Sequence, residues 1–267
     1  GRAMSFAEVV GKDNVRYELQ MKGCGRSPFS RGFDGKAVLR SSTREFLASE
    51  SMYHLNVETT RALSLVGTGE SIRRAWYSSK EPRDKSHPQY ASKYPPDQLV
   101  SEKGAITTRV AKSFIRFAQL ELFAKRGEQD ELLALMDYAC FREHPELLSP
   151  EDYLDNVVTK QDSSDSEAIL PVRMIRPGPL ERYVEFYRKI GQNAVKLVVD
   201  WIRVGYVQGN MNSDNTLIGG RTLDYGPFGF MERYSPLYQP FTSDQDGKFA
   251  FMRQPSAMQM NMVTLSC

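Results

Sequence analysis

The chain has 267 residues, of which 40% are hydrophobic and 25% are charged, and its formal net charge is +2. This is an ordinary globular composition, and the length allows one large domain or two lobes with cores of their own. So small a net charge creates no field that would attract nucleic acid or an anionic membrane, so neither is expected as a partner. No apolar run approaches the roughly 18 residues that a membrane span needs.

The cysteines and histidines are scattered through the chain without the spacing of a metal site (Cys24, Cys140, Cys267, His54, His87 and His144). This favours a reducing compartment and argues against a cysteine-rich zinc site. The sequence opens on glycine without a visible signal or transit pattern, and it stops without a polar tail. We therefore expect a fragment of a longer protein that is incomplete at both ends.

The first part of the chain is predicted to be rich in β-strands. Residues 16–22 alternate apolar and polar side chains, which is the pattern of a half-buried strand, and residues 36–40 form a second short strand after a turn at Asp34-Gly35. Residues 61–66 and 105–111 indicate further strands. The polar, proline-bearing residues 77–103 indicate an exposed insertion.

One helix is predicted within this β-rich part, over residues 41–55. Phe46, Leu47, Met52 and Leu55 have helical spacing, and Ser42 followed by Glu45 has the spacing of a capping box at the start of the helix.

From residue 112 onward the pattern becomes helical. Residues 112–127 and 128–143 carry apolar side chains at spacings of three and four, and residues 180–205 form a long amphipathic helix. The side chains expected to be buried on that helix are Val184, Tyr187, Ile190, Ala194, Leu197, Val198 and Trp201. A solvated loop is expected at 159–168. The predicted fold class is thus α+β in two lobes, with a β-rich lobe over 1–111 and a helical lobe over 112–267.

The stretch from residue 207 to 230 concentrates Asn, Asp and Gly around a short apolar piece. These residues are typical of turns, but carboxylate and amide oxygens are also the ligands of hard divalent cations. A tiny hairpin turning at Gly219-Gly220 would bring Asp224 back toward Asp214-Asn215. Such a hairpin would supply two oxygen ligands to one Mg²⁺, which favours the metal interpretation.

The order of charged residues matches the needs of a kinase-type phosphotransferase. Lys22 would hold phosphates, Glu45 on the first helix would fix that lysine, and Asp214 would be the base, with Asn215 and Asp224 as metal ligands. Each residue has an alternative role when taken alone: a solvated lysine, a helix-capping glutamate and an Asp-Asn turn.

Two arginines, Arg109 and Arg116, lie seven residues apart across a predicted strand-to-helix junction. From the residues alone, they are either surface residues or carboxylate partners.

Long ordered motifs resemble the selenoprotein O family, whose members are protein adenylyltransferases of protein-kinase-like fold. The resemblance covers most of residues 1–260 and is weakest in the polar insertion. The motifs are ELQMKGCGRSPFSRGFDGKAVLRSSTREFLASESMYHL (18–55), TTRAL (59–63), RVAKSFIRF (109–117), MNSDN (211–215) and LDYGPFGF (223–230).

The resemblance implies transfer of AMP from ATP to Ser, Thr or Tyr hydroxyls of proteins, with Mg²⁺ or alternatively Mn²⁺ bound and pyrophosphate released. ATP would lie inverted relative to a kinase, so that Arg109 and Arg116 receive its terminal phosphates. The implied ATP contacts are Gly1, Arg2, Lys22, Asp34, Gly35, Arg109, Arg116 and Asp224; the implied base is Asp214, and the implied Mg²⁺ ligands are Asn215 and Asp224.

The chain departs from the family pattern next to the catalytic residues. Gln208-Gly209-Asn210 stands where His-Gly-Val is usual, and Ser213 replaces a common Thr.

Eukaryotic relatives imply a mitochondrial location, and a cytoplasmic one is implied otherwise. We expect the carboxyl-terminal part of the family, in which many eukaryotic members carry selenocysteine, to lie outside this fragment. A kinase that transfers the γ-phosphate and an inactive nucleotide-binding module remain alternatives. The residues alone permit the kinase equally well, and the paired arginines favour adenylyl transfer only through the resemblance.

Overall fold

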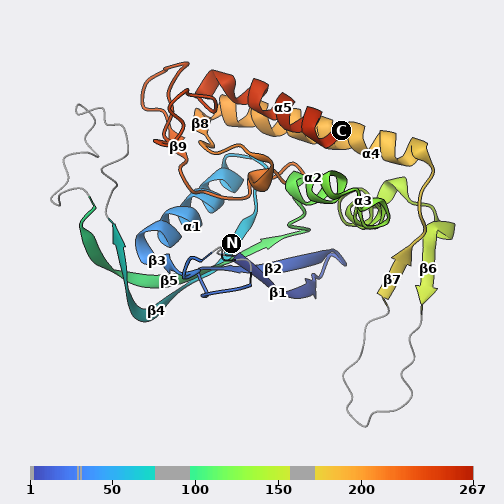
Figure 1. The fold of residues 1–267 in the computed structure, drawn as a ribbon, viewed down its shortest axis with the longest axis horizontal. Helices are drawn as coiled ribbons and strands as arrows, with labels where there is room; N and C mark the ends of the chain where they lie inside the picture. The colour runs from blue at the N-terminus through green and yellow to red at the C-terminus, as the bar shows by residue number, and fades with distance from the viewer. Residues whose placement is uncertain (1–2, 29, 31, 76–96, 157–171, 267) are drawn as a thin grey trace, which may run out of the picture.

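The protein is an α+β structure in a computed structural model, which describes residues 3–28, 30, 32–75, 97–156 and 172–266. An antiparallel sheet lies on one side of the molecule in Figure 1, helices α4 and α5 pack against each other on the opposite side, and α1 lies between them. The sheet strands are β1 (Ala3–Val10), β2 (Arg16–Lys22), β3 (Ala37–Val38), β4 (Arg61–Ala75) and β5 (Leu99–Ala111).

Strand β5 organises the sheet because it pairs with three other strands. Strand β4 follows one edge of β5 for nearly its whole length, while β2 and β3 pair with successive parts of β5, and β1 pairs with β2. The predicted strands at 61–66 and 105–111 are therefore segments of longer strands. The predicted insertion is correspondingly shorter, since residues 99–103 belong to β5. Residues 76–96 and the predicted loop at 159–168 lie outside the described residues.

Helix α1 (Leu39–His54) begins earlier than predicted. The predicted strand at 36–40 is limited to two residues, and Val38 is the residue that caps the helix. Ser42 therefore lies inside the helix, and the predicted capping box with Glu45 is wrong. A capping box requires its first residue to be non-helical, which Ser42 is not.

The remaining helices follow the sheet in the chain. The predicted helical segment at 112–127 is helical only from Phe117, because Arg116 is the extended residue that caps it. The elements of this part are α2 (Phe117–Arg126), α3 (Gln129–Glu143), β6 (Tyr153–Asn156), β7 (Val172–Ile175), α4 (Leu180–Arg203), β8 (Tyr206–Val207), β9 (Gly229–Phe230) and α5 (Gln254–Ser266). Among the described residues, no helix combines the length and the apolar character that a membrane crossing requires.

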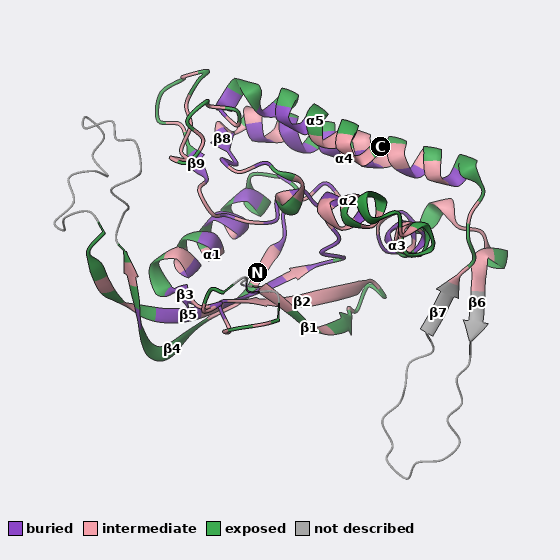
Figure 2. Ribbon diagram, in the orientation of Figure 1, coloured by how far each residue is buried: buried purple, intermediate pink, exposed green. Residues whose placement is uncertain are grey.

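Two buried clusters hold the helices together. One is built by α1, α4, α5 and the segment 206–228, and the other by α2, α3 and α4 (Figure 2). Five of the seven residues predicted to be buried on α4 are buried, but Val184 is 51% exposed and Tyr187 only half-buried, since Phe186 takes the inward position. Because α1 contributes to the first cluster and also packs on the sheet, it joins the sheet to the helical part of the molecule.

Candidate functional site

Lys22 and Arg109 lie on the same face of the sheet because of its register. Gln20 is paired with Arg109, and Lys22 with Thr107. Residues opposite each other in an antiparallel pair share a face, and so do residues two positions apart on one strand. The two cations therefore project from neighbouring strands toward the face that α1 covers.

Helix α1 places Glu45 between these two cations. Lys22 forms an ion pair with Glu45, as the sequence predicted, and Arg109 Nε lies 2.6 Å from Glu45 Oε1. The side chain of Glu45 is 4% exposed and that of Arg109 is 6% exposed. Such burial is tolerable for charges only when they are paired, and here each carboxylate oxygen of Glu45 has its own cationic partner.

Asp224 completes a four-residue network with Lys22, Glu45 and Arg109. Its Oδ1 accepts hydrogen bonds from Lys22 Nζ and Arg109 Nη2. Burial raises the pKa of Asp224, but the attraction of Lys22 and Arg109 outweighs burial and holds the pKa well below its usual range. Arg109 is thus a carboxylate partner, one of the two alternatives that its sequence position left open. The Asp224 side chain keeps 25% of its surface exposed, so a ligand can reach it.

The segment before Asp224 forms the predicted tight hairpin. Thr216 bridges to Thr222, and the backbone nitrogen of Gly220 donates to the carbonyl oxygen of Leu217 at 3.1 Å. Gly220 has a φ of +64°, and a Cβ there would lie 2.6 Å from the Cβ of Asn193. Only glycine fits this turn without strain. The hairpin separates the Asp214-Asn215 pair from Asp224 and reverses the chain between them.

Asp214 and Asn215 lie in a single 3₁₀ turn, Ser213–Asn215. The side-chain amide of Asn215 donates to the carbonyl oxygen of Asn210 at 3.2 Å, which fixes the amide plane. Arg116 caps α2, and its Nη1 donates to the backbone oxygen of Asp214 at 3.3 Å. The structure therefore brings Arg116 to the Asp214 turn, whereas Arg109 lies in the network around Glu45.

The remaining predicted nucleotide contacts are distributed around the first part of the chain. Asp34 pairs with Arg74 at 2.7 Å and accepts from the backbone nitrogen of Lys36. Gly35 has a φ of +67°, and a Cβ there would lie 1.9 Å from the carbonyl oxygen of Gly25, so the turn requires glycine. Gly1 and Arg2 lie outside the described residues.

Gln208, which departs from the pattern that the resemblance implies, supports the site. This side chain is 2% exposed, and its Nε2 donates to the backbone oxygen of Asp224 at 2.7 Å. Its Oε1 accepts from the hydroxyl of Tyr206, and its backbone nitrogen donates to Gln254 on α5. The departure from the family pattern therefore leaves the polypeptide next to Asp224 anchored. The sequence identified the position as unusual but not these partners, which come from β8 and α5.

A family model described as protein adenylyltransferase SelO matches residues 1–84 and 91–267. The chain belongs to this family. It is 40% identical, over its entire length, to the protein nucleotidyltransferase YdiU of Xanthomonas oryzae pv. oryzae strain PXO99A, and it covers 43% of that protein. The corresponding proteins of Methylobacillus flagellatus and of Xanthomonas campestris pv. campestris strain B100 are also 40% identical over 268 residues, with 43% covered.

This SelO-family chain thus spans less than half the length of these relatives. All three relatives are bacterial, and they give no support to the expected mitochondrial location.

Asp224 and Asn215 of this SelO-family chain carry oxygen donors of the type that a magnesium ion shared with a nucleotide would use. Within the described residues, no group of three or more His, Cys, Asp or Glu side chains could enclose a metal alone. Mg²⁺ is usually held by one or two protein carboxylates together with substrate phosphates, so a complete protein cage is not needed. Asp224 has both cations of the network on Oδ1, and its Oδ2 faces Gly226. Asp224 and Asn215 supply the hard oxygen atoms that such an ion prefers.

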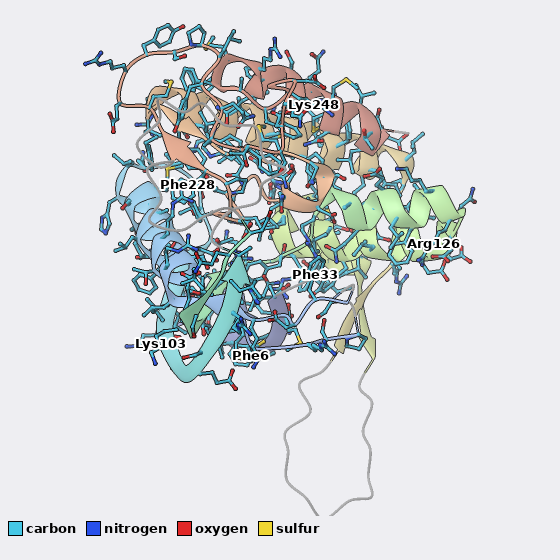
Figure 3. All side chains as sticks on the ribbon, turned by 60° about the vertical axis from the view of Figure 1, so that its left-hand side comes forward. Phe6, Phe33, Lys103, Arg126, Phe228 and Lys248 are labelled. Atoms are coloured by element: carbon cyan, nitrogen blue, oxygen red, sulfur yellow. The ribbon has the colours of Figure 1, made fainter. Side chains whose placement is uncertain are left out.

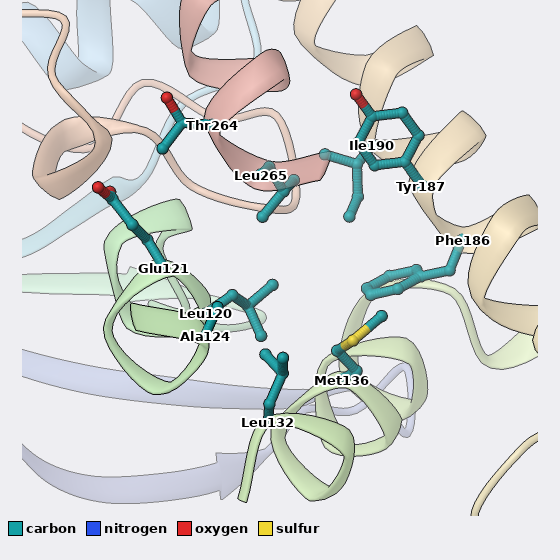
Figure 4. Close-up of a pocket in the computed structure, with 10 residues that line it drawn as sticks. All are labelled: Leu120, Glu121, Ala124, Leu132, Met136, Phe186, Tyr187, Ile190, Thr264 and Leu265. Atoms are coloured by element: carbon teal, nitrogen blue, oxygen red, sulfur yellow. The ribbon is translucent and has the colours of Figure 1, made fainter. Parts of the chain in front are cut away.

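In the described part of the chain, neither of two cavities among the helices is lined by the charged network. An apolar cavity of about 90 Å³ lies among α2, α3, α4 and α5, with Leu132, Phe186 and Leu265 pointing into it (Figure 4). A more polar cavity of about 150 Å³ is lined by Asn212, Ser213, Lys248 and residues of α2 and α5. The second cavity is therefore next to the turn that carries Asp214.

Proposed function

We propose that this chain contains the nucleotide site of a protein adenylyltransferase with a kinase-like, two-lobed fold. The lobes are residues 1–111 and 112–267, and the site is at their junction. The observation that carries the proposal is the network of Lys22, Glu45, Arg109 and Asp224 in a member of the SelO family. It joins residues up to 202 positions apart, and its pairing of a strand lysine with a helix glutamate is the pairing that a kinase uses.

Each residue of the site has a defined task in the proposed reaction. Asp214 accepts the proton of the acceptor hydroxyl, whose oxygen then bonds to the α-phosphorus of ATP while the bond to pyrophosphate breaks. Lys22 contacts the phosphates, and Asn215 and Asp224 hold Mg²⁺, with Mn²⁺ as the alternative ion. When bound, the ion neutralises negative charge on the phosphates.

Arg116 and Arg109 differ in how readily they can contact the terminal phosphates of ATP. Arg116 is next to the Asp214 turn, and its guanidinium can meet phosphate oxygens with two parallel hydrogen bonds. Arg109 is paired with Glu45 and Asp224, so its contact with a terminal phosphate requires exchange of at least one of these partners. Asp34, Gly35 and the Gly1-Arg2 pair are proposed to line the nucleotide.

The main alternative is a kinase that uses the same residues on the opposite end of ATP. An inactive nucleotide-binding module is disfavoured because Asp214, Asn215 and Asp224 are all present. Protein acceptors are the proposed partners, and the exclusion of nucleic acid stays a prediction.

Labelled ATP distinguishes adenylyl transfer from phosphoryl transfer. The protein, purified at the length its gene encodes, is incubated with Mg²⁺, acceptor proteins and ATP labelled on the α- or the γ-phosphate. The α-label should enter protein and pyrophosphate should be released, while the γ-label should not enter protein. Transfer of the γ-label alone would establish a kinase, and transfer of neither label would support the inactive module.

Arginine variants test the assignment of the terminal phosphates. Arg116→Ala should slow transfer, because one charged contact with the phosphates is lost. Hydrogen bonds to charged groups contribute roughly 1.5–3 kcal/mol, and we expect the activation free energy to rise by about that amount. Arg126→Ala is the control, because Arg126 lies on the same helix and its partner Glu128 is 3.8 Å away at the surface. Equal rates for the two variants would show that Arg116 does not bind the terminal phosphates.

A further inference from the structure

Arg44, the neighbour of Glu45 on α1, contacts the segment that follows Asp224. Its Nη1 donates to the carbonyl oxygen of Gly226 at 2.8 Å, and its Nη2 donates to the carbonyl oxygen of Phe228. Its Cζ also lies 3.8 Å from the centre of the Phe228 ring. Figure 3 shows Phe228 next to α1. One guanidinium therefore binds two backbone carbonyls and one aromatic face of the same short segment.

The contacted segment is firmly attached to the helical part of the molecule. Phe228 stacks on Tyr206 with ring centres 5.8 Å apart and packs edge-on against Tyr225. All three rings belong to the buried cluster formed with α4 and α5. A contact from α1 to this segment is consequently a contact between the part that carries Glu45 and the part that carries Asp224.

Successive residues of a helix point about 100° apart, because the helix has 3.6 residues per turn. Glu45 therefore faces the sheet and its cations, while Arg44 faces the segment after Asp224. The same turn of α1 thus fixes one end of the network directly and the other end through the backbone beyond Asp224. A small shift of α1 would change both ends together.

We propose that Arg44 is a positioning residue that keeps Asp224 in register with Glu45 and Lys22. It acts through the backbone of residues 226–228 and does not touch the nucleotide. The inference rests on the proposed function, because the reaction it serves is adenylyl transfer. Arginine is required here since its planar fork reaches two acceptors and stacks on a ring at once, which the single ammonium of lysine cannot do.

The chain supplies a matched control on the same helix. Arg40, one turn earlier, holds the two carboxylate oxygens of Glu102 on β5 at 2.9 and 3.1 Å. It also ties α1 to a neighbouring element with a guanidinium fork, but to the sheet and not to the segment after Asp224. Removal of Arg40 therefore tests the general effect of losing a charged contact of α1.

The experiment compares Arg44→Ala, Arg44→Lys and Arg40→Ala by three measurements. The first is amide hydrogen exchange of residues 224–230 without nucleotide; the others are kcat and KM for α-label transfer, and the melting temperature. Arg44→Ala should increase exchange in this segment and lower kcat on the order of 10- to 100-fold, since small misplacements of reacting groups have effects of that size. KM for Mg-ATP should rise as well, because the displaced Asp224 is one of the proposed ligands of the metal. Arg44→Lys should recover only part of the loss, and Arg40→Ala should match the wild type.

The measurements separate failure of this inference from failure of the proposed function. If the wild type transfers no α-label, the proposed function is wrong, and hydrogen exchange alone decides whether Arg44 holds the segment. Unchanged exchange and unchanged kcat in Arg44→Ala would overturn the positioning role. Full recovery by Arg44→Lys, or an equal loss in Arg40→Ala, would also overturn it. If Arg44→Ala does not fold, Arg44→Lys provides the same comparison.

Discussion

Glu45 is the residue on which the buried charges of the site depend most. It has one cation on each carboxylate oxygen, and Arg109 is almost as deeply buried as Glu45 itself. Asp224 supplies the second negative charge, but its Oδ1 already accepts from both Lys22 and Arg109. The network is therefore balanced with two positive and two negative groups, and removal of either carboxylate leaves an uncompensated positive charge.

Glu45→Gln should lower the free energy of unfolding by about 3–5 kcal/mol, the range observed when one partner of a buried ion pair is removed. Urea unfolding at neutral pH measures the change. The control is Glu70→Gln, which breaks the Lys36–Glu70 pair at 2.6 Å, whose side chains are 39% and 55% exposed. Exposed pairs contribute about 0–1 kcal/mol, so the control should be nearly neutral. Similar losses in both variants would show that the network is not a buried, mutually dependent set.

At the scale of elements, the hairpin 216–222 sets the distance between the Asp214 turn and Asp224. Arg221 holds both carboxylate oxygens of Glu143 on α3 at 2.8 and 2.6 Å, and Ser113 donates to the same glutamate. Burial raises the pKa of Glu143, but Arg221 outweighs burial and lowers the pKa below its ordinary value. The hairpin is thus anchored to α3 by an ionised pair and to α4 by close contact at Gly220.

Gly220→Ala should weaken Mg-ATP binding as well as lower stability. The added Cβ meets Asn193 at 2.6 Å and the backbone has a φ of +64°, so the turn must move and carry Asn215 with it. Gly127→Ala is the control, because its φ of +71° imposes similar strain but its Cβ would meet nothing within 4 Å. The control should lose only about 1 kcal/mol of stability and keep its affinity for Mg-ATP, measured by calorimetry. Equal affinities in the two variants would mean that the hairpin does not position the metal ligands.

At the scale of the whole molecule, local patterns predicted most elements but few of the contacts between them. Alternation along 16–22 and the apolar stripe of 180–205 depend on neighbours in the sequence, so β2 and the inward face of α4 were largely predictable. The start of α1 was not, because Ser42 and Glu45 have capping spacing whether or not the helix begins there. Exposed β1 lacks a clear apolar alternation and was missed.

The sequence predicted which residues belong to the candidate site and their order along the chain, but not which of them contact one another. The Lys22–Glu45 pair follows from the order of elements and was predicted correctly. The position of Arg109 in the network depends on the register of β5 against β2, which no local pattern fixes. Gln208, which follows β8, anchors Asp224, and Arg44 on α1 anchors the segment after it; both contacts join residues that are not neighbours in the sequence, so no local pattern predicts them.

We propose one division of roles in the site, in which Asn215 and Asp224 hold the metal of Mg-ATP and Asp214 acts on the chemical step. Mg-ATP affinity, measured by calorimetry on Asp224→Ala, Asn215→Ala and Asp214→Ala of the protein at the length its gene encodes, tests it most directly. A metal ligand contributes to binding in the ground state, whereas a base contributes mainly to turnover. Asp224→Ala and Asn215→Ala should bind Mg-ATP more weakly, and Asp214→Ala should bind it like the wild type but transfer no AMP. An equal loss of affinity in all three variants would contradict the account.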